Sequence, residues 1–280
     1  MKSFTLSLVC VALLFTGCNK PQPADLTILG WWSPYYFMPE QLNGKVKMVT
    51  EQNYWTTLDK GRYIKGVPIT TAWKVKIGWT PDFRINFNEQ GQLVKCDYLA
   101  ETGAAWGSWN ITYDNELPTL ATYQENDSLK ITAVIKTDET KNITETQNYA
   151  GSSKTLLSRN VWIYSEKDRF IKTLFYNSLD QLTKNYRYTW DKNSRITEVE
   201  SYSGEDSLKG KYLIDYNKYG FSKKQQRLTA TGTTIKSVSV TYEYDEHLNW
   251  TKAVYIENGK PIVIAERYYE YYTNGSSQAK

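Results

Sequence analysis

Apolar and polar residues alternate along short stretches that recur through most of the chain. The stretches are Phe83-Ile85-Phe87, Trp109-Ile111-Tyr113, Ile131-Ala133-Ile135, Trp162-Tyr164, Tyr186-Tyr188-Trp190, Tyr212-Ile214-Tyr216 and Val238-Val240-Tyr242-Tyr244. A period of two, carried by aromatic and β-branched residues, is typical of strands with one buried face. Helical periodicity is nearly absent. The pattern therefore predicts an all-β protein of antiparallel strands.

An aromatic residue followed by Asp, Asn or Ser ends most of these stretches, and we call this residue the anchor. Anchors lie at Phe87, Tyr113, Tyr164, Trp190, Tyr216 and Tyr244, with a degenerate copy at Thr137-Asp138. Successive copies are 26, 24, 27, 26, 26 and 28 residues apart. Such a constant period is the signature of a repeat architecture. The stacked rings of the anchors are expected to form one continuous hydrophobic seam, the spine of the core.

The residue after each anchor predicts a turn, because Asp and Asn hydrogen-bond their own backbone two residues on. An apolar residue six positions after the anchor restarts a strand, at Leu93, Ile143, Phe170, Ile196 and Trp250. A return turn follows about thirteen residues later, as at Asn258-Gly259, a strong hairpin signal. We therefore expect an elongated antiparallel meander of about seven two-strand repeats of about 26 residues, curled into a single sheet or shell. Closure into a barrel stays an open alternative.

His247 is the only histidine and lies beside Asp245 and Glu246. Asp245 occupies the turn-starting position of its repeat, and a lone histidine is a poor ligand set for a metal. The cluster is interpreted as a turn, and the sequence predicts no metal site, no catalytic residue and no cofactor.

The N-terminus predicts export. Residues 1–17 read as a signal peptide whose apolar run is too short to span a bilayer as a helix. The run ends in Phe15-Thr16-Gly17-Cys18, which resembles a bacterial lipobox with cleavage before a lipid-bearing Cys18. The alternative is an ordinary signal peptide with an incidental cysteine. We expect a protein held in the outer membrane by lipid on Cys18, on the periplasmic side rather than at the cell surface.

The remaining chain divides into four segments. Residues 18–27 form a lipidated tether, and residues 28–80 form an N-terminal β cap with a first hairpin, including a strand in "GVPITTAWKVKIGW". Residues 81–272 form the repeat domain, and residues 273–280 a flexible tail. The last strand, Ile262 to Tyr272, is expected to be an edge guarded by Glu266, Arg267 and Glu270.

Charge and cysteine content narrow the function. The mature chain would carry 33 Lys and Arg, since Lys2 leaves with the signal, against 30 Asp and Glu. The charges are interspersed rather than clustered on a basic face, which disfavours nucleic acid as a partner. Cys96 is the only other cysteine of the mature chain, so no internal disulfide forms. Charged residues such as Lys95, Arg187, Glu198 and Glu200 within candidate strands disfavour an outer-membrane barrel.

The repeat unit resembles the YD-repeat family, which is related to Rhs-type repeats. The clearest copy is "YEYDEHLNWTKAVYIENGKPI", and "QLNGKVKMVTEQNYW" resembles the first strand of lipid-anchored members from Gram-negative anaerobes. The resemblance covers residues 42–272 and departs from the pattern at Lys141, Asp168 and Leu248, where glycine is expected. It implies long antiparallel sheets curled into shells or ribbons, and it transfers no catalytic residue.

Three functions are compared. The first is a non-enzymatic cell-envelope lipoprotein whose sheet is a binding or scaffolding surface for an unknown protein or glycan. The second is a glycan-binding lipoprotein with exposed aromatic residues at Trp31, Trp32, Tyr35, Tyr36, Trp106 and Trp109. The third, an enzyme, is disfavoured because no nucleophile, phosphate-binding or metal-ligand pattern is present. Ser128 and Ser207 follow Asp and precede Leu, which resembles an O-glycosylation acceptor of some anaerobic lipoproteins, although Asp-Ser is common in turns.

Overall fold

The computed structural model describes residues 42–77, 81–165 and 169–273. Within these ranges the chain forms 17 strands and one short helix, α1 (Thr71–Ile77). The first nine strands are β1 (Val46–Asp59), β2 (Arg62–Pro68), β3 (Asp82–Phe87), β4 (Leu93–Leu99), β5 (Ala105–Asp114), β6 (Leu117–Glu125), β7 (Ser128–Asp138), β8 (Ile143–Ala150) and β9 (Leu156–Tyr164). The others are β10 (Phe170–Asn177), β11 (Leu182–Trp190), β12 (Ile196–Ser203), β13 (Ser207–Tyr216), β14 (Ser222–Thr229), β15 (Thr234–Tyr244), β16 (Trp250–Glu257) and β17 (Lys260–Tyr271). The prediction of an all-β protein is confirmed.

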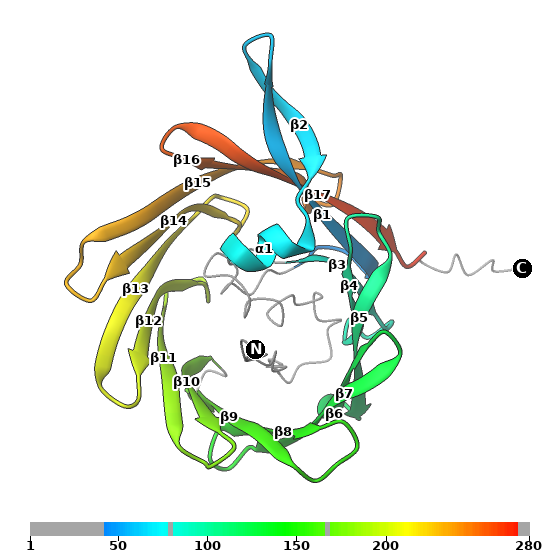
Figure 1. The fold of residues 1–280 in the computed structure, drawn as a ribbon, viewed down its shortest axis with the longest axis vertical. Helices are drawn as coiled ribbons and strands as arrows, with labels where there is room; N and C mark the ends of the chain where they lie inside the picture. Colours follow the sequence, from blue (N-terminus) through cyan, green and yellow to red (C-terminus); the bar gives the residue numbers. More distant parts are fainter. Residues whose placement is uncertain (1–41, 78–80, 166–168, 274–280) are drawn as a thin grey trace, which may run out of the picture.

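The sheet is closed into a barrel (Figure 1). Each strand from β3 to β17 pairs antiparallel with the next, and β1 joins the two ends of this series. One edge of β1 pairs with β17, for example Glu51 with Arg267, and the other edge pairs with β3 from Met48 to Glu51. Sixteen strands form the ring, and β2 pairs with β1 outside it. The expectation of an open, curled sheet is wrong, because β1 closes it.

The closing strand also corrects the expected guarded edge. Residues Ile262 to Tyr271 lie in β17, which pairs with β16 on one side and β1 on the other. Arg267 is buried rather than an exposed guard, and its side chain faces Glu51. The sequence pattern shows which residues form the strand but does not show that its second edge has a partner.

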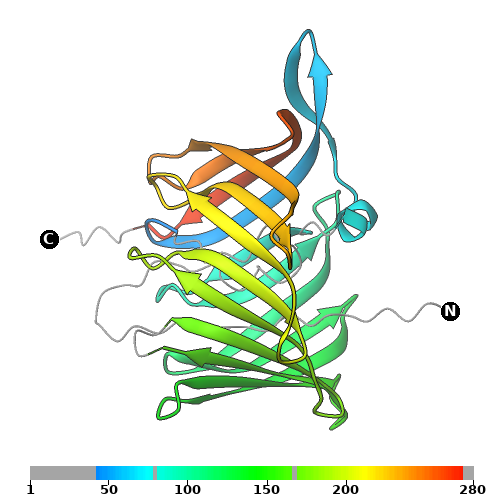
Figure 2. The ribbon, with the colours of Figure 1, turned by 90° about the vertical axis from the view of Figure 1, so that its left-hand side faces the viewer.

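The structure confirms that the repeated anchor and restart residues mark the ends and starts of strands. Each of the six anchors lies at or next to the last residue of an odd-numbered strand from β3 to β15. The five predicted restart residues are the first residues of β4, β8, β10, β12 and β16. Because the anchors close successive odd-numbered strands of one antiparallel ring, they all lie toward the same end of the barrel, the left-hand end in Figure 2. We call it the anchor end.

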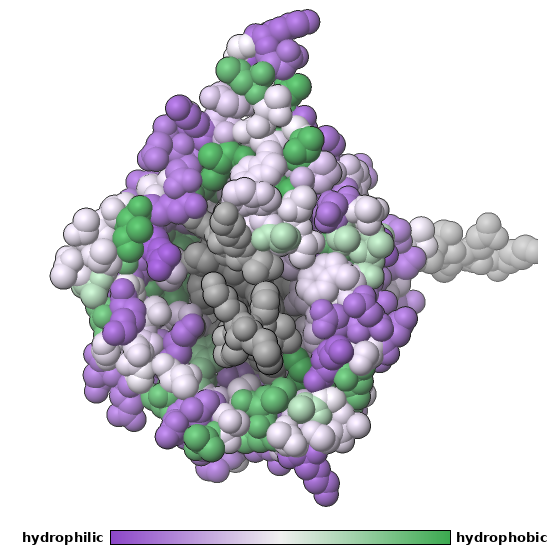
Figure 3. Space-filling model, viewed as in Figure 1, coloured by the Kyte–Doolittle hydropathy of each residue, from purple (hydrophilic) through white to green (hydrophobic). Residues whose placement is uncertain are grey.

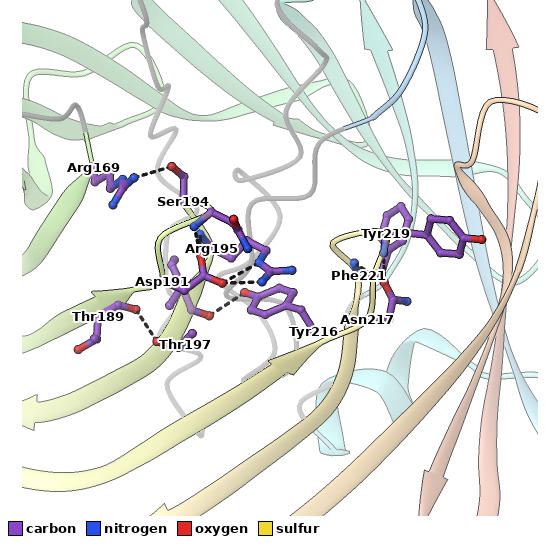
Figure 4. A network of polar contacts seen from close by, with 12 residues as sticks. Arg169, Thr189, Asp191, Ser194, Arg195, Thr197, Tyr216, Asn217, Tyr219 and Phe221 are labelled. Carbon is purple, nitrogen blue, oxygen red and sulfur yellow. Dashed lines mark hydrogen bonds and ion pairs between the residues drawn. The ribbon is translucent and has the colours of Figure 1, made fainter.

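Five turns share one construction, which Figure 4 shows at Asp191 and Asn217. The Asp or Asn side chain accepts hydrogen bonds from the backbone N–H groups two and four residues later, as Asp191 does from Asn193 (2.8 Å) and Arg195 (3.0 Å). The other four turns begin at Asn88, Asn177, Asn217 and Asp245. The Asp245 turn contains His247, whose ring packs on Tyr271 with centroids 4.2 Å apart. The interpretation of this cluster as a turn is confirmed.

A bulge follows each of these five turns, and a tyrosine hydroxyl contacts the start of the next strand in several repeats. The register shifts where Tyr216 faces Ser222 and where Trp190 faces Ile196. The Tyr216 hydroxyl donates to the Ile196 carbonyl at 2.7 Å, and Tyr113 and Tyr242 do the same to Leu93 and Ser222. A bulge leaves ladder groups unpaired. Each of these tyrosine hydroxyls instead bonds the carbonyl of the first residue of a strand, which holds the start of that strand in place.

Helix α1 corrects a second prediction, since "TTAWKVKI" alternates like a strand but folds as a helix. The Lys74 N–H donates to the Thr70 carbonyl at 3.0 Å, which starts the first turn. Two tertiary contacts favour the helix over a strand. The Lys74 side chain reaches the buried Asp82 carboxylate, and the Trp73 ring meets the Trp55 ring edge-on at 6.1 Å. In Figures 1 and 2, α1 lies at the rim opposite the anchor end.

Candidate functional site

The inner face of the barrel is the candidate site, and its main part is apolar. Strand alternation buries about every second residue, and since no other described element covers the convex face, the buried residues face inward (Figure 1). One register row crosses six strands in order, through Val49, Ile85, Cys96, Trp109, Tyr123 and Ile131. All six are buried. Burial also raises the pKa of the Cys96 thiol far above its usual range, so this cysteine is unreactive.

Buried apolar residues of the described chain form three clusters around the inner face. The first lies on β1 and β3 to β7 and includes Trp109, the second includes Trp250 and Tyr255, and the third includes Tyr188 and Val199. Aromatic contacts are dense in the second cluster, where Tyr242 packs on Tyr244 and Trp250 with centroids about 6 Å apart. The expected single seam of anchor rings is therefore divided into three parts.

A polar strip separates the first cluster from the third. Inward positions on β8, β9 and β10 carry uncharged polar side chains with at most 4% exposure: Thr144, Thr146, Asn148, Asn160 and Thr173. Asn148 donates to Ser158 at 3.1 Å, and Thr173 donates to the Tyr188 hydroxyl at 3.2 Å. The Thr146 hydroxyl has no hydrogen-bond partner among the described residues. Burying a hydroxyl without a hydrogen-bond partner costs free energy. A bound molecule that formed a hydrogen bond with Thr146 would remove this cost.

One buried ion pair crosses the closing strands. Arg267 Nε donates to Glu51 Oε2 at 2.9 Å, and the two side chains are 1% and 0% exposed. The guanidinium also lies 3.8 Å from the centroid of the Trp250 ring, a cation–π contact. Glu51 Oε1 accepts a hydrogen bond from Asn53 Nδ2 at 3.3 Å. The pair therefore balances its own charge inside the apolar second cluster.

A second buried pair lies where β1 changes partner from β3 to β2. Asp82 accepts hydrogen bonds from the Asn53 backbone N–H at 2.8 Å and from Asn53 Nδ2 at 3.0 Å, and it pairs with Lys74 of α1. Burial raises the pKa of Asp82, and the Lys74 charge opposes this shift. Burial lowers the pKa of Lys74, and Asp82 opposes that shift in turn. The Asp82 carboxylate accepts the Asn53 backbone N–H as the carbonyl of a neighbouring strand would. Its ion pair with Lys74 also connects α1 to the ring.

The outer face is charged and cross-linked by ion pairs. Lys211 lies between Glu198 (2.9 Å) and Glu200 (2.6 Å), and hydrogen bonding to Lys211 lowers the pKa of Glu200. Arg159 pairs with Glu145 and Asp180 and lies over the Tyr176 ring. Figure 3 shows hydrophilic side chains around most of the outer contour. The outer face thus carries the exposed ion pairs, whereas the buried apolar clusters lie on the inner face.

The proposed glycan-binding aromatics fall into two groups. Trp31, Trp32, Tyr35 and Tyr36 lie outside the described residues, as does the lipidation candidate Cys18. Trp109 is 4% exposed and packs on Tyr123 with centroids 5.2 Å apart. Trp106 stacks on Tyr98 at 5.5 Å with an interplanar angle of 26°. The rings of Trp106 and Trp109 therefore contact protein rather than stand free.

The O-glycosylation candidates are both accessible. Ser128 and Ser207 are the exposed first residues of β7 and β13, next to the return turns. They lie at the end of the barrel opposite the anchor end, because even-numbered strands end there.

Neither a metal centre nor a membrane-crossing helix is found in the part of the chain that the structure describes. Over those residues no three His, Cys, Asp or Glu side chains gather in a way that could hold a metal ion. No helix there has the length and apolar character needed to cross a bilayer.

Sequence reasoning missed the two buried ion pairs, which are formed by Glu51 with Arg267 and by Lys74 with Asp82. A signal was present for two of these residues. Arg267 is in phase with the buried Val263 and Ala265, and Glu51 is in phase with Val49. A charged residue at an inward position of an alternating strand indicates a buried partner. The partner itself cannot be found this way, because it lies on the strand at the other end of the chain.

Comparisons with known proteins add a fold likeness only. No family model and no curated protein matches the chain. It is similar to a solved porin-like protein from Bacteroides uniformis, with 8% identity, a TM-score of 0.38, and coverage of 81% of this chain and 98% of that one. A second porin-like protein, from Bacteroides vulgatus, has 14% identity, a TM-score of 0.29 and coverage of 81% and 99%.

A putative outer membrane lipoprotein-sorting protein domain from Vibrio parahaemolyticus has 6% identity, a TM-score of 0.25 and coverage of 82% of this chain and 88% of that one. The resemblance of the repeats to the YD-repeat family is not supported by any family match. The function is therefore argued from the chain's own residues.

Proposed function

We propose that this protein is a non-enzymatic binding lipoprotein of the cell envelope that holds an amphipathic ligand against the inner face of its barrel. One observation carries the proposal: the apolar and aromatic side chains line the inside, while the outside carries the ion pairs. A closed ring of sixteen strands is in general wide enough to enclose an internal space. An apolar interior of that width is stable only when something other than water covers it.

The inner face also indicates the chemistry of the ligand. Its three apolar clusters fit hydrocarbon, and the polar strip with the unpartnered Thr146 hydroxyl fits an uncharged hydrogen-bonding group. The buried charges at Glu51, Arg267, Asp82 and Lys74 are already paired with one another. A charged group on the ligand would find no free counter-charge among them. The ligand class is therefore an acyl-chain lipid with an uncharged polar linkage.

Binding of a fluorescent acyl ester, which has an acyl chain and an uncharged polar linkage, tests this proposal. Ala133 and Ala253 are inward-facing and 2% and 0% exposed, so a tryptophan at either site would fill space next to an apolar cluster. We expect saturable probe binding by the mature protein and at least a tenfold weaker Kd in Ala133→Trp, because the added ring occupies ligand volume. Ser239→Trp on the outer face is the matched control and is expected to bind like the parent.

The same titration gives the opposing outcomes. Absence of saturable binding in the parent, or equal weakening in Ala133→Trp and Ser239→Trp, would refute a lumenal lipid site. Far-ultraviolet circular dichroism and Tm identify a variant that fails to fold, in which case Thr146→Val replaces it. That change keeps the shape of the side chain and removes the unpartnered hydroxyl, so it tests the polar strip alone.

The anchoring part of the proposal rests on the lipobox-like sequence before Cys18. A diacylglyceryl-modified cysteine would hold the barrel at the outer membrane, facing the periplasm. Intact-mass analysis of protein from its native host is expected to show acyl mass that is lost in Cys18→Ser. The same spectrum tests the exposed Ser128 and Ser207, where added hexose mass lost in Ser128→Ala and Ser207→Ala would establish O-glycosylation.

Glycan binding is the second candidate, and one described residue favours it. Trp73 on α1 is 48% exposed beside Trp55 at the barrel rim, and an exposed indole ring can pack against a sugar. A glycan array probed with the parent and with Trp73→Ala tests this role. Binding that persists in Trp73→Ala, or no binding at all, would leave the lipid proposal as the better account.

A further inference from the structure

A two-stranded ribbon, residues 56–67, projects from the barrel wall, and we call it the hairpin extension (Figures 1 and 2). It joins the last four residues of β1 to β2, with Leu58 facing Tyr63 and Thr57 facing Ile64. Lys60 and Gly61 form its tip with φ angles of 46° and 77°, as in a type I′ turn. β17 pairs with β1 only up to Trp55, so among the described residues no third strand supports the ribbon beyond that point.

The hairpin extension exposes an unusual amount of apolar surface. Leu58, Tyr63, Ile64 and Val67 are 61%, 44%, 45% and 68% exposed. Figure 3 shows these hydrophobic patches below a hydrophilic tip on the projecting part of the molecule. Leu58 and Tyr63 share one face of the ribbon, and Ile64 lies on the opposite face, because paired residues point the same way and successive residues point opposite ways. Contiguous exposed apolar surface marks an interaction site.

Cations surround this apolar surface. Lys60 and Arg62 flank the tip and form no ion pair within the residues that the structure describes. Lys65 lies further along and pairs with Glu266 at 2.8 Å. Asp59 is the single acidic residue among residues 56–67, so three cations against one acid leave a net charge of +2. The ribbon therefore has apolar side chains on both faces and cations at its tip. Such a surface complements an anionic bilayer, whose acyl chains contact apolar groups and whose phosphates attract cations.

We propose that the hairpin extension inserts into the surface of a bilayer that contains anionic lipid. A folded partner with one flat surface would cover only one face of the ribbon, whereas lipid surrounds both. Leu58, Ile64 and Val67 would enter the acyl boundary, and Tyr63 would lie at the headgroup level that tyrosine prefers. Lys60 and Arg62 would meet lipid phosphates. The site is separate from the inner face and does not rest on the function proposed for it.

Vesicle co-sedimentation tests the proposal. The mature chain from residue 18, carrying Cys18→Ser so that no acyl chain contributes, is mixed with phosphatidylcholine vesicles with and without phosphatidylglycerol. Binding is expected only with the anionic lipid. Lys60→Gln with Arg62→Gln should weaken partitioning about fivefold for each cation. Leu58→Ser with Ile64→Ser should weaken it at least tenfold.

Matched controls separate insertion from general stickiness. Leu179→Ser with Ile235→Ser changes two equally exposed apolar residues elsewhere, 74% and 55% exposed, and should leave binding unchanged. A second readout uses Tyr63→Cys labelled with an environment-sensitive fluorophore, since the buried Cys96 does not compete for label. Its emission should shift to the blue on adding anionic vesicles, and a label at Leu179→Cys should not shift.

Three outcomes would overturn the proposal. The first is no sedimentation of the parent with anionic vesicles. The second is an equal loss in the hairpin and control variants. The third is a lipid-free dimer that Ile64→Ser dissociates, which would show that the exposed edge of β2 pairs with a second copy of the chain.

Discussion

Arg267 lies at an inward position whose strand neighbours Val263 and Ala265 are apolar, yet its guanidinium is buried against Glu51 and the Trp250 ring. Removing two charges from water costs several kcal/mol each, and their attraction repays this only with good geometry. The geometry here is good, with a 2.9 Å contact and a ring below the cation. The pair therefore adds little to the free energy of unfolding, and its main effect is to fix the register in which β1 pairs with β17.

A double-mutant cycle on this pair measures that distinction. Arg267→Met alone should lower the free energy of unfolding by about 3–5 kcal/mol, because it leaves the Glu51 carboxylate buried and unpaired. Adding Glu51→Leu should recover most of the loss, since two apolar side chains suit the cluster. Lys47→Ala, which breaks the exposed pair with Glu270, is the control and should cost less than about 1 kcal/mol.

Urea denaturation of the four proteins of the cycle gives these free energies. If the two single losses simply add in the double variant, the charges stabilise independently and the interpretation as an alignment device fails.

At the scale of single elements, the five Asx turns show how local chemistry sets strand boundaries. The fourth residue of each turn is left-handed: Gly91, Asp180, Ser194, Gly220 and Leu248, with φ between 58° and 92°. Its N–H donates to the carbonyl of the first residue in every case, at 3.0 to 3.2 Å. Leucine is strained at such an angle, and Leu248 is one of the three positions where the repeat pattern departs from glycine.

Leu248→Gly should therefore raise the free energy of unfolding by about 1 kcal/mol. The relief of left-handed strain exceeds the added entropy of the unfolded glycine. Leu248 is 47% exposed, so little packing is lost. Thermal and urea denaturation report the change.

The reverse substitution is the matched control. Gly220→Leu should destabilise by about the same amount, because a Cβ at Gly220 meets no atom within 4 Å and only the backbone angle opposes it. A neutral or destabilising Leu248→Gly would show that the leucine side chain makes a contact that outweighs its strain.

These elements were predictable because their signals are local. The anchor, the Asx residue and the restart residue lie within seven positions of one another, so the sequence alone places both strand ends. α1 was not predictable in this way. Its residues alternate like a strand, and its conformation depends on Asp82 and Trp55, which belong to other elements. Tertiary contacts override a short apolar pattern of this kind.

At the scale of the whole molecule, closure was the part that the sequence left open. Every repeat pairs with its neighbour whether the sheet is open or closed, so the period is the same in both cases. What differs is the pairing of Val46–Trp55 with Val263–Tyr271, more than 200 residues apart. The inward Glu51 and Arg267 hint at it, but only once the two strands are known to be neighbours. The candidate site is the inside of the ring. It could therefore not be predicted from a sequence that does not show whether the sheet closes.

The many enclosed tyrosines make the whole barrel sensitive to alkali. Burial raises the pKa of Tyr123 and Tyr164 from 10.0 to about 12, and those of Tyr113, Tyr188 and Tyr271 further. In the unfolded chain these groups lose their protons near pH 10.0, before the folded chain does. Rising pH therefore favours the unfolded state. Stability should be fully present below about pH 10 and fall steadily through about pH 12.

Tyrosinate absorbance and circular dichroism, followed together against pH, check this expectation. The buried tyrosines should ionise in one cooperative step with the loss of structure. If most tyrosines titrate near 10 while the circular dichroism is unchanged, the rings are accessible to solvent and the described burial is incorrect.

The way β1 meets β17 has a consequence for biogenesis. The ribosome makes β1 first and β17 last, so the pairing of β1 with β17 can form only after the entire barrel has been synthesised. Until then the edge of β1 that pairs with β17 offers unpaired backbone to any neighbouring chain, and pairing between distant segments is slow. A newly made molecule is therefore open to wrong pairing until β17 is complete, and a nonsense codon as late as residue 262 would leave this edge of β1 permanently without its partner.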